Sequence, residues 1–266
     1  MEWNKAKSVL LAVLLCANLF LAGNLALQIA QGRTQQRQAM DQALELLHQD
    51  LGDFDETMFR AADGRRPVLA FNRSPEKERA AALALLGADQ SDTEGGVSTF
   101  RSPQGELIFR TGGELRLNLA LPPLEQDTPA FCRQLLEQAG FPMKGCLSWE
   151  EGDRVFFQQQ TEGVKIQQCV LECATDGQSL EIQGRWLLAD QALQVGDGSK
   201  GYQMAVALRA YLIQQDIRRP PSAVEEVYRL QDQSNGRLLA WPAWLVTAEG
   251  RQHLIGGENA EYGERS

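Results

Sequence analysis

The residue types that most often carry out chemistry in proteins are scarce in this sequence. Its two histidines, His48 and His253, lie far apart and are expected on different elements. A Ser-His-Asp or Cys-His arrangement needs a histidine beside a nucleophile, and no Gly-x-Ser-x-Gly nucleophile elbow is present. We therefore interpret both as solvent or sheet-edge histidines, expect no catalytic residue, and predict that the protein is not an enzyme.

Three further patterns resemble ligand sites only in part. Residues 196–201 read Gly-Asp-Gly-Ser-Lys-Gly, which lacks the Gly-Lys-Ser/Thr order that places a lysine on phosphates. The acidic residues at 53–56 do not have the spacing of a calcium loop. Cys169 and Cys173, with no further histidine or cysteine beside them, are a weak metal signal. We expect no cofactor, no metal and no small-molecule substrate.

Four of the five cysteines lie outside the apolar N-terminal stretch that holds Cys16. Cys169 and Cys173 fall on one predicted strand, so their Cα atoms would be roughly 13 Å apart. A disulfide tolerates at most about 7 Å, which excludes a bridge between these two. Two interpretations stay open: buried free thiols, or bridges with other partners, such as Cys132 with Cys146.

The N-terminal stretch is the strongest pattern in the chain. Residues 8–32 contain no charged side chain, and a helix of that length reaches roughly 37 Å. Because the hydrocarbon core of a bilayer is about 30 Å thick, the pattern predicts a transmembrane helix at 8–32 behind a cytoplasmic tail at 1–7. A signal peptide cleaved near residues 30–32 and a lipoprotein modified at Cys16 fit less well.

The charges beside this stretch do not settle its orientation. Lys5 and Lys7 precede it, and Arg33 and Arg37 follow it, so the positive-inside count is a tie. The short N-terminal tail favours a single-pass protein of the cell membrane with an extracellular body. The chain carries a net charge of −9, which argues against nucleic acid because such a partner needs a clustered basic footprint.

Polar and small residues recur within the apolar stretch. Asn24 and Gln28 share a helix face, and small residues let a second helix approach closely. One interpretation is ordinary tolerance of a few amides; the other is a face that docks a partner helix in the membrane. The candidate contact residues are Asn18, Ala22, Asn24, Ala26 and Gln28.

The rest of the chain predicts helices and antiparallel strands, an α+β organisation. Helical spacing continues over 33–51, and Ser74 with Pro75 predicts a helix that ends at Gly87. Hairpins then follow helices twice, which indicates a coarse repeat. The predicted parts are a first α+β domain at 33–121, a linker at 122–128, a helix-plus-sheet module at 129–195 and a second such module at 196–266.

Three segments resemble the YycI (WalI) family and its sister family YycH. They are Met1–Lys7, the stretch from Phe156 to Ile166, and Leu239–Thr247. The resemblance implies a membrane-anchored extracytoplasmic protein of Gram-positive bacteria without a catalytic site. It implies two partners, a YycH-like protein and a WalK/YycG-like sensor histidine kinase of a two-component system that controls the cell wall. Single hairpins also resemble PepSY-like modules, so an extracellular binding or inhibitory module for a peptidase is the alternative.

Overall fold

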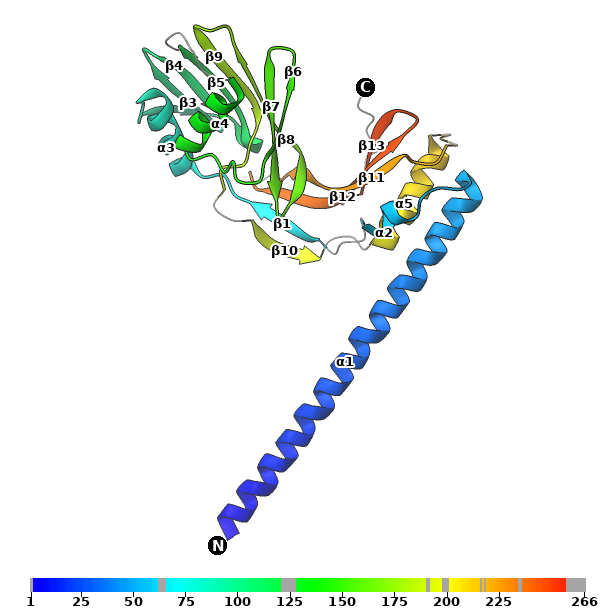
Figure 1. Cartoon of the computed structure of the whole chain (residues 1–266). Coiled ribbons are helices and arrows are strands. Elements are labelled where there is room, and N and C mark those ends of the chain that lie inside the picture. Colours follow the sequence, from blue (N-terminus) through cyan, green and yellow to red (C-terminus); the bar gives the residue numbers. More distant parts are fainter. Residues whose placement is uncertain are drawn as a thin grey trace.

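A computed structural model describes residues 2–61, 66–120, 128–189, 192–197, 201–215, 217, 219–233 and 236–256. The chain begins with one helix, α1 (Glu2–Leu51), which is 50 residues long. Figure 1 shows that only its C-terminal end lies against the rest of the chain. This end packs on α5 (Gly201–Gln214). It buries Met40, Ala43, Leu44, Leu47 and Leu51.

A glycine ends α1, as its sequence pattern predicts. Gly52 has a φ of 82°, a conformation that side-chain-bearing residues avoid. Its N–H donates to the carbonyl of His48 at 2.9 Å. The chain then turns into the short helix α2 (Thr57–Ala61). Phe59 of α2 is buried in the same apolar cluster as the end of α1 and α5, so this glycine turn folds the chain back into the core.

The predicted fold class is wrong at residues 8–32. Within the part of the chain that the structure describes, no helix has both the length and the apolar character needed to cross a bilayer. The stretch forms part of α1 instead. The prediction rested on the length of this stretch and on its lack of charge. Asn18 and Gln31 place exposed amides on this helix, and an unpaired amide in hydrocarbon costs free energy.

A helix followed by an antiparallel meander occurs three times in the described residues. The first unit has α3 (Pro75–Leu86), β2 (Ser91–Glu94), β3 (Val97–Ser102), β4 (Gly105–Phe109) and β5 (Glu114–Ala120). The second has α4 (Thr128–Gln138), β6 (Leu147–Glu151), β7 (Arg154–Thr161), β8 (Val164–Thr175) and β9 (Ser179–Arg185). The third has α5, β11 (Ala223–Asp232), β12 (Leu238–Ala248) and β13 (Arg251–Gly256). The repeat predicted in the second half therefore extends to the first.

All described strands join one sheet of 13 strands. Two of them lie outside the repeated units, β1 (Pro67–Phe71) and β10 (Leu193–Asp197). The main path runs β10-β1-β12-β11-β8-β9-β5-β4-β3-β2, with β13 on β12 and the β6–β7 hairpin on β8. All pairs are antiparallel except β8 with β11, which are parallel. The predicted domain ranges 33–121, 129–195 and 196–266 thus all contribute strands to this sheet.

The long strand β8 connects two halves of the sheet. Its first residues, Lys165 and Ile166, pair with β11, while Leu171 to Thr175 pair with β9. Helices α3 and α4 cover the half that contains β9, β5, β4 and β3 (Figure 1). The end of α1 with α2 and α5 covers the half that contains β12 and β13. The sheet therefore changes its covering helices at β8.

Local sequence signals agree with most elements of the body. Ser74 caps α3 by accepting from the Lys77 N–H, Pro75 begins it, and Gly87 ends it in the left-handed conformation. The polar composition of residues 89–96 predicts a loop, but β2 lies there. Strands β6 and β10 were not predicted. Apart from Thr128, which begins α4, the predicted linker 122–128 lies outside the described residues.

Candidate binding groove

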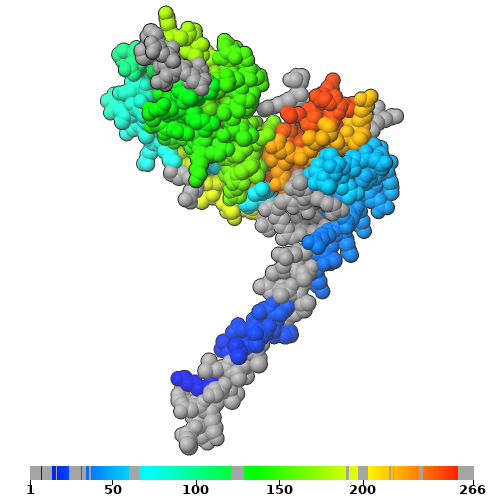
Figure 2. All heavy atoms as spheres, in the orientation of Figure 1, coloured from blue at the N-terminus to red at the C-terminus, as the bar shows by residue number. Residues whose placement is uncertain are grey.

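The residues predicted to contact a membrane partner all lie on α1. Asn18 and Ala22 are exposed on the part of α1 that stands clear of the body (Figure 2). The side chains of Asn24, Ala26 and Gln28 lie outside those that the structure describes. Of the candidates, the two with described side chains therefore lie open on α1, and the docking face stays a prediction.

The two histidines occupy different surroundings. His48 fits its prediction: its Nε2 lies 3.1 Å from a Glu56 carboxylate oxygen, and its ring stacks on Phe54. His253 lies on β13, which among the described strands pairs only with β12 and is therefore a sheet edge, but α5 buries it, with its Nδ1 2.9 Å from the Tyr211 hydroxyl. No group of three His, Cys, Asp or Glu side chains within the described residues is arranged to hold a metal ion.

The four cysteines of the body are free thiols. Cys132 of α4 and Cys173 of β8 are buried and share a hydrogen bond between their thiols. This hydrogen bond, together with burial, raises the pKa of Cys173. Burial also raises the pKa of Cys169 and of the half-buried Cys146. The hydrogen bond with Cys173 lowers the pKa of Cys132 instead, but Cys132 is fully buried. Thiols held in their neutral form are poor nucleophiles, so Cys146, Cys169 and Cys173 are packing residues, and burial gives Cys132 the same role.

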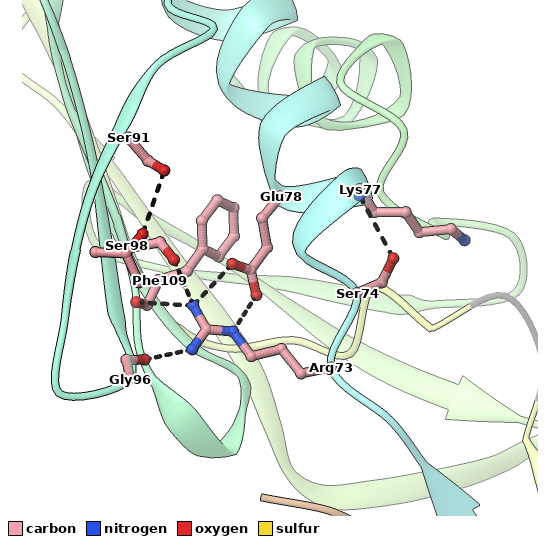
Figure 3. Close-up of polar contacts among 9 residues, drawn as sticks. Arg73, Ser74, Lys77, Glu78, Ser91, Gly96, Ser98 and Phe109 are labelled. Carbon is pink, nitrogen blue, oxygen red and sulfur yellow. Dashed lines mark hydrogen bonds and ion pairs between the residues drawn. The ribbon is translucent and has the colours of Figure 1, made fainter.

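An ion pair between Arg73 and Glu78 fixes the start of α3 to the sheet (Figure 3). The Arg73 guanidinium donates to both carboxylate oxygens of Glu78, at 2.5 and 2.8 Å. It also donates to the Ser98 hydroxyl at 2.9 Å and to the carbonyls of Gly96 and Phe109. Because each group is engaged within the fold, this network serves structure and leaves no cation free for a ligand.

A groove of about 650 Å³ lies among charged side chains on the sheet. We call it the arginine groove. Leu107, Phe109 and Leu117 of β4 and β5 are buried under α3 and α4. Residues between them on a strand face the other side, so the groove lies on the face opposite these helices. Its polar lining is Arg110, Glu114, Arg116, Gln167, Gln168, Gln183 and Arg185.

Register brings these side chains together from distant parts of the chain. Arg116 of β5 pairs with Ile108 of β4 on one side and with Gln183 of β9 on the other. Two residues away on each strand, Glu114 pairs with Arg185. These strands come from two of the three repeated units, so the groove exists only when both units have joined the sheet.

The three arginines of the groove differ in their ion pairs and in their exposure. Arg116 donates to Glu181 at 2.8 Å, and both side chains are exposed. Arg185 is mostly buried and lies 3.4 Å from a Glu114 oxygen and 3.7 Å from an Asp232 oxygen. Arg110 is exposed and has no ion pair with any residue that the structure describes. Such long or solvent-exposed pairs are weak, so an incoming anion can replace them.

Two close contacts shape the floor of the groove. A side chain on Gly184 would place its Cβ 2.0 Å from the Val170 carbonyl oxygen, so only glycine lets β9 approach β8 here. Gln168 ties β8 to β11: its amide oxygen accepts from the Leu230 N–H at 2.8 Å, and its amide nitrogen donates to the Leu230 carbonyl at 3.4 Å. The groove thus lies where β8 passes from β11 to β9.

Sequence reasoning did not find the arginine groove. The alternation of Leu115, Leu117 and Leu119 predicts a half-buried strand, and it places Arg116 on the exposed face. The exposed position of Arg116 is the one feature of the groove that this pattern indicates. The strand that brings Arg185 beside Glu114 lies far along the chain, and a single sequence does not specify this pairing.

No protein-family model matches the chain, and no curated protein matches it. Two solved structures align with most of the chain. One is an uncharacterized protein from Eubacterium rectale ATCC 33656, with 11% identity and a TM-score of 0.39 over 75% of this chain and 81% of that one. The other is the YpeB C-terminal domain of Bacillus megaterium, with 10% identity and a TM-score of 0.33 over 74% of this chain and 99% of that one. Similarity at this level is evidence of neither family nor function.

Proposed function

We propose that this protein is a regulatory binding protein that acts by direct contact with a partner protein and catalyses no reaction itself. The observation that carries the proposal is the arginine groove, an open, cation-lined hollow of about 650 Å³ on the sheet face opposite α3 and α4. Ligand sites in proteins have volumes of this order. The resemblance to YycI and YycH names the expected partners, a sensor histidine kinase and a YycH-like protein.

The chemistry of the lining favours binding over catalysis. The described residues of the groove comprise three arginines, one carboxylate, three amides and apolar or glycine residues, with no histidine and no cysteine. A general acid or base works best with a pKa near the working pH, and guanidinium and amide groups do not titrate there. These groups can instead hold and orient an anionic partner.

Co-purification tests the proposal. The full chain would be tagged in its native host, crosslinked in living cells and purified, and the captured proteins would be identified by mass spectrometry. We expect a sensor histidine kinase and a YycH-like protein above the level seen with an unrelated tagged protein. Capture of neither protein, in this experiment and in the reverse one with a tagged kinase, would overturn the proposal.

The repeated helix-plus-meander unit favours a second candidate, a binding or inhibitory module for a peptidase. In the described residues the unit occurs three times and forms one continuous sheet, which offers a broad surface to a protein partner. The test is to add the purified chain in excess to extracellular peptidases of the same host. Unchanged peptidase activity throughout would exclude this candidate.

A further inference from the structure

The arginine groove is cationic although the chain as a whole is acidic. Its lining carries three arginines and one glutamate, with Glu181 and Asp232 beside two of these arginines from outside the lining, whereas the chain has a formal net charge of −9. A concave cationic site within an acidic surface concentrates the field and favours negatively charged ligands locally. The long-range field of the chain opposes such ligands, so binding must depend on close contacts within the groove.

The groove also has unused hydrogen-bond donors. A guanidinium has five N–H donors. Among the described residues, Arg185 donates one hydrogen bond, to a Glu114 carboxylate oxygen at 3.4 Å. An Asp232 carboxylate oxygen lies 3.7 Å from the same guanidinium nitrogen. Arg110 donates to none of the described side chains. Carboxylates bind guanidinium groups well because one carboxylate accepts two parallel N–H···O bonds from one arginine.

Apolar and amide groups lie between the cations. Ile108 and Val170 are half-buried and line the groove beside Gln167 and Gln183. A bare inorganic anion would leave these two apolar side chains without a contact. The lining as a whole therefore fits a ligand that carries carboxylates on a partly apolar chain.

The spacing of the groove matches that of an extended peptide. Arg116 of β5 and Arg185 of β9 are diagonal neighbours on two paired strands, since Arg116 pairs with Gln183 and Arg185 with Glu114, and such diagonal neighbours lie about 7 Å apart. Alternate side chains of an extended peptide have the same spacing. Successive carboxylates on one side of such a peptide can therefore meet successive arginines.

We propose that the arginine groove binds an acidic, extended segment of the partner protein, with Arg110, Arg116 and Arg185 holding its carboxylates and Ile108 and Val170 contacting the apolar residues between them. This inference rests on the proposed function, since it assigns the site and the chemistry of that contact. On binding, Glu114, Glu181 and Asp232 would release their arginines to the incoming carboxylates and turn to solvent.

Fluorescence anisotropy tests the chemistry directly. The probe is a labelled eight-residue peptide in which glutamate alternates with valine, and the comparison is a peptide in which lysine replaces glutamate. We expect the acidic peptide to bind and the basic one not to bind. Because binding is electrostatic, its affinity should fall as salt is raised. Equal binding of both peptides, or full competition by millimolar inorganic phosphate, would overturn the inference.

Two variants of the full chain locate the site. Arg110→Gln with Arg116→Gln removes two groove cations, both exposed, and should weaken the acidic peptide on the order of tenfold. The matched control is Arg101→Gln on β3, an exposed arginine that pairs across strands with Glu106 at 2.6 Å and does not line the groove. The control should bind within about twofold of wild type. Circular dichroism checks that both variants fold. If the double variant and the Arg101→Gln control lose peptide affinity equally, the peptide does not bind in the groove.

Co-purification with the same variants separates the two proposals. If the double variant recovers the partner as well as wild type does, the groove inference fails and the regulatory role stands. If wild type binds the acidic peptide with the expected variant pattern but recovers no partner, the regulatory role fails and the groove's chemistry stands. Loss of the partner in the double variant alone supports both.

Discussion

The Arg73 guanidinium donates hydrogen bonds to both carboxylate oxygens of Glu78, which is among the most buried charged residues in the described chain. The pair holds the start of α3 against the β3–β4 hairpin through Ser98 and Phe109. Since α3 covers the face opposite the arginine groove, this ion pair supports the half of the sheet on which the groove is built.

Removing one member of this pair should destabilise the protein. Glu78→Ala leaves a largely buried guanidinium without its counter-charge, and we expect a loss of about 3 kcal/mol in the free energy of unfolding. Glu106→Ala breaks the exposed pair with Arg101 and should cost less than about 1 kcal/mol. Urea denaturation of both variants measures the difference. Similar losses in the two would show that the buried pair has no special role.

Gly184 should tolerate no side chain. A Cβ there would lie 2.0 Å from the Val170 carbonyl oxygen, and its φ is 140°, so Gly184→Ala must push β9 away from β8. We expect a loss of about 3 kcal/mol, with weaker peptide binding because the groove floor moves. Gly177→Ala is the control, since Gly177 has a positive φ but open space around it. Thermal unfolding measures the stability of both variants. Equal losses of stability in Gly184→Ala and Gly177→Ala would contradict the requirement for glycine at position 184.

The cysteines should differ in reactivity in the folded chain. Cys132, Cys169 and Cys173 are fully buried, whereas Cys146 is only half-buried and accepts a hydrogen bond from Arg133 at 3.3 Å. Of these four, Cys146 should react first with N-ethylmaleimide, and slowly, because burial raises its pKa. The other three should react only after unfolding. Peptide mapping by mass spectrometry measures each site, and rapid labelling of Cys173 in the native state would contradict the packing.

Tyr228 should make the fold sensitive to alkali. Burial, and then the nearby Glu162 carboxylate, raise its pKa from 10.0 to about 12. Below pH 10 the phenol is neutral in both states; between pH 10 and 12 only the unfolded state ionises it, so stability falls as pH rises. The wild type should lose stability relative to Tyr228→Phe across this window. If the difference in the free energy of unfolding between wild type and Tyr228→Phe stays constant from pH 8 to 12, the prediction for Tyr228 is wrong.

Local signals account for much of the fold because they act over a few residues. Ser74, Pro75 and Gly87 mark both ends of α3, and the alternating leucines of β5 mark one buried face. Strands β2 and β6 lacked such a signal because all their residues are exposed. A strand without a buried face shows no alternation.

The errors have a different physical origin. The membrane-spanning prediction at 8–32 rested on the length of this stretch and on its lack of charge, although amides such as Asn18 interrupt the stretch. His253 was expected at solvent or at a sheet edge; it lies on the edge strand β13, and its burial depends on the packing of α5 against β13. The arginine groove depends on pairing between β5 and β9, a contact between units that local patterns do not determine.

Site-specific photocrosslinking tests the central claim most directly. A photoreactive amino acid would replace Gln183, which is exposed in the groove, or Leu83, which is exposed on α3 on the opposite face. Both chains would be produced in the native host, irradiated and searched for crosslinked partners. We predict a crosslink to the sensor histidine kinase or the YycH-like protein from position 183 and none from position 83. A partner crosslinked from position 83 and not from position 183 would contradict the account.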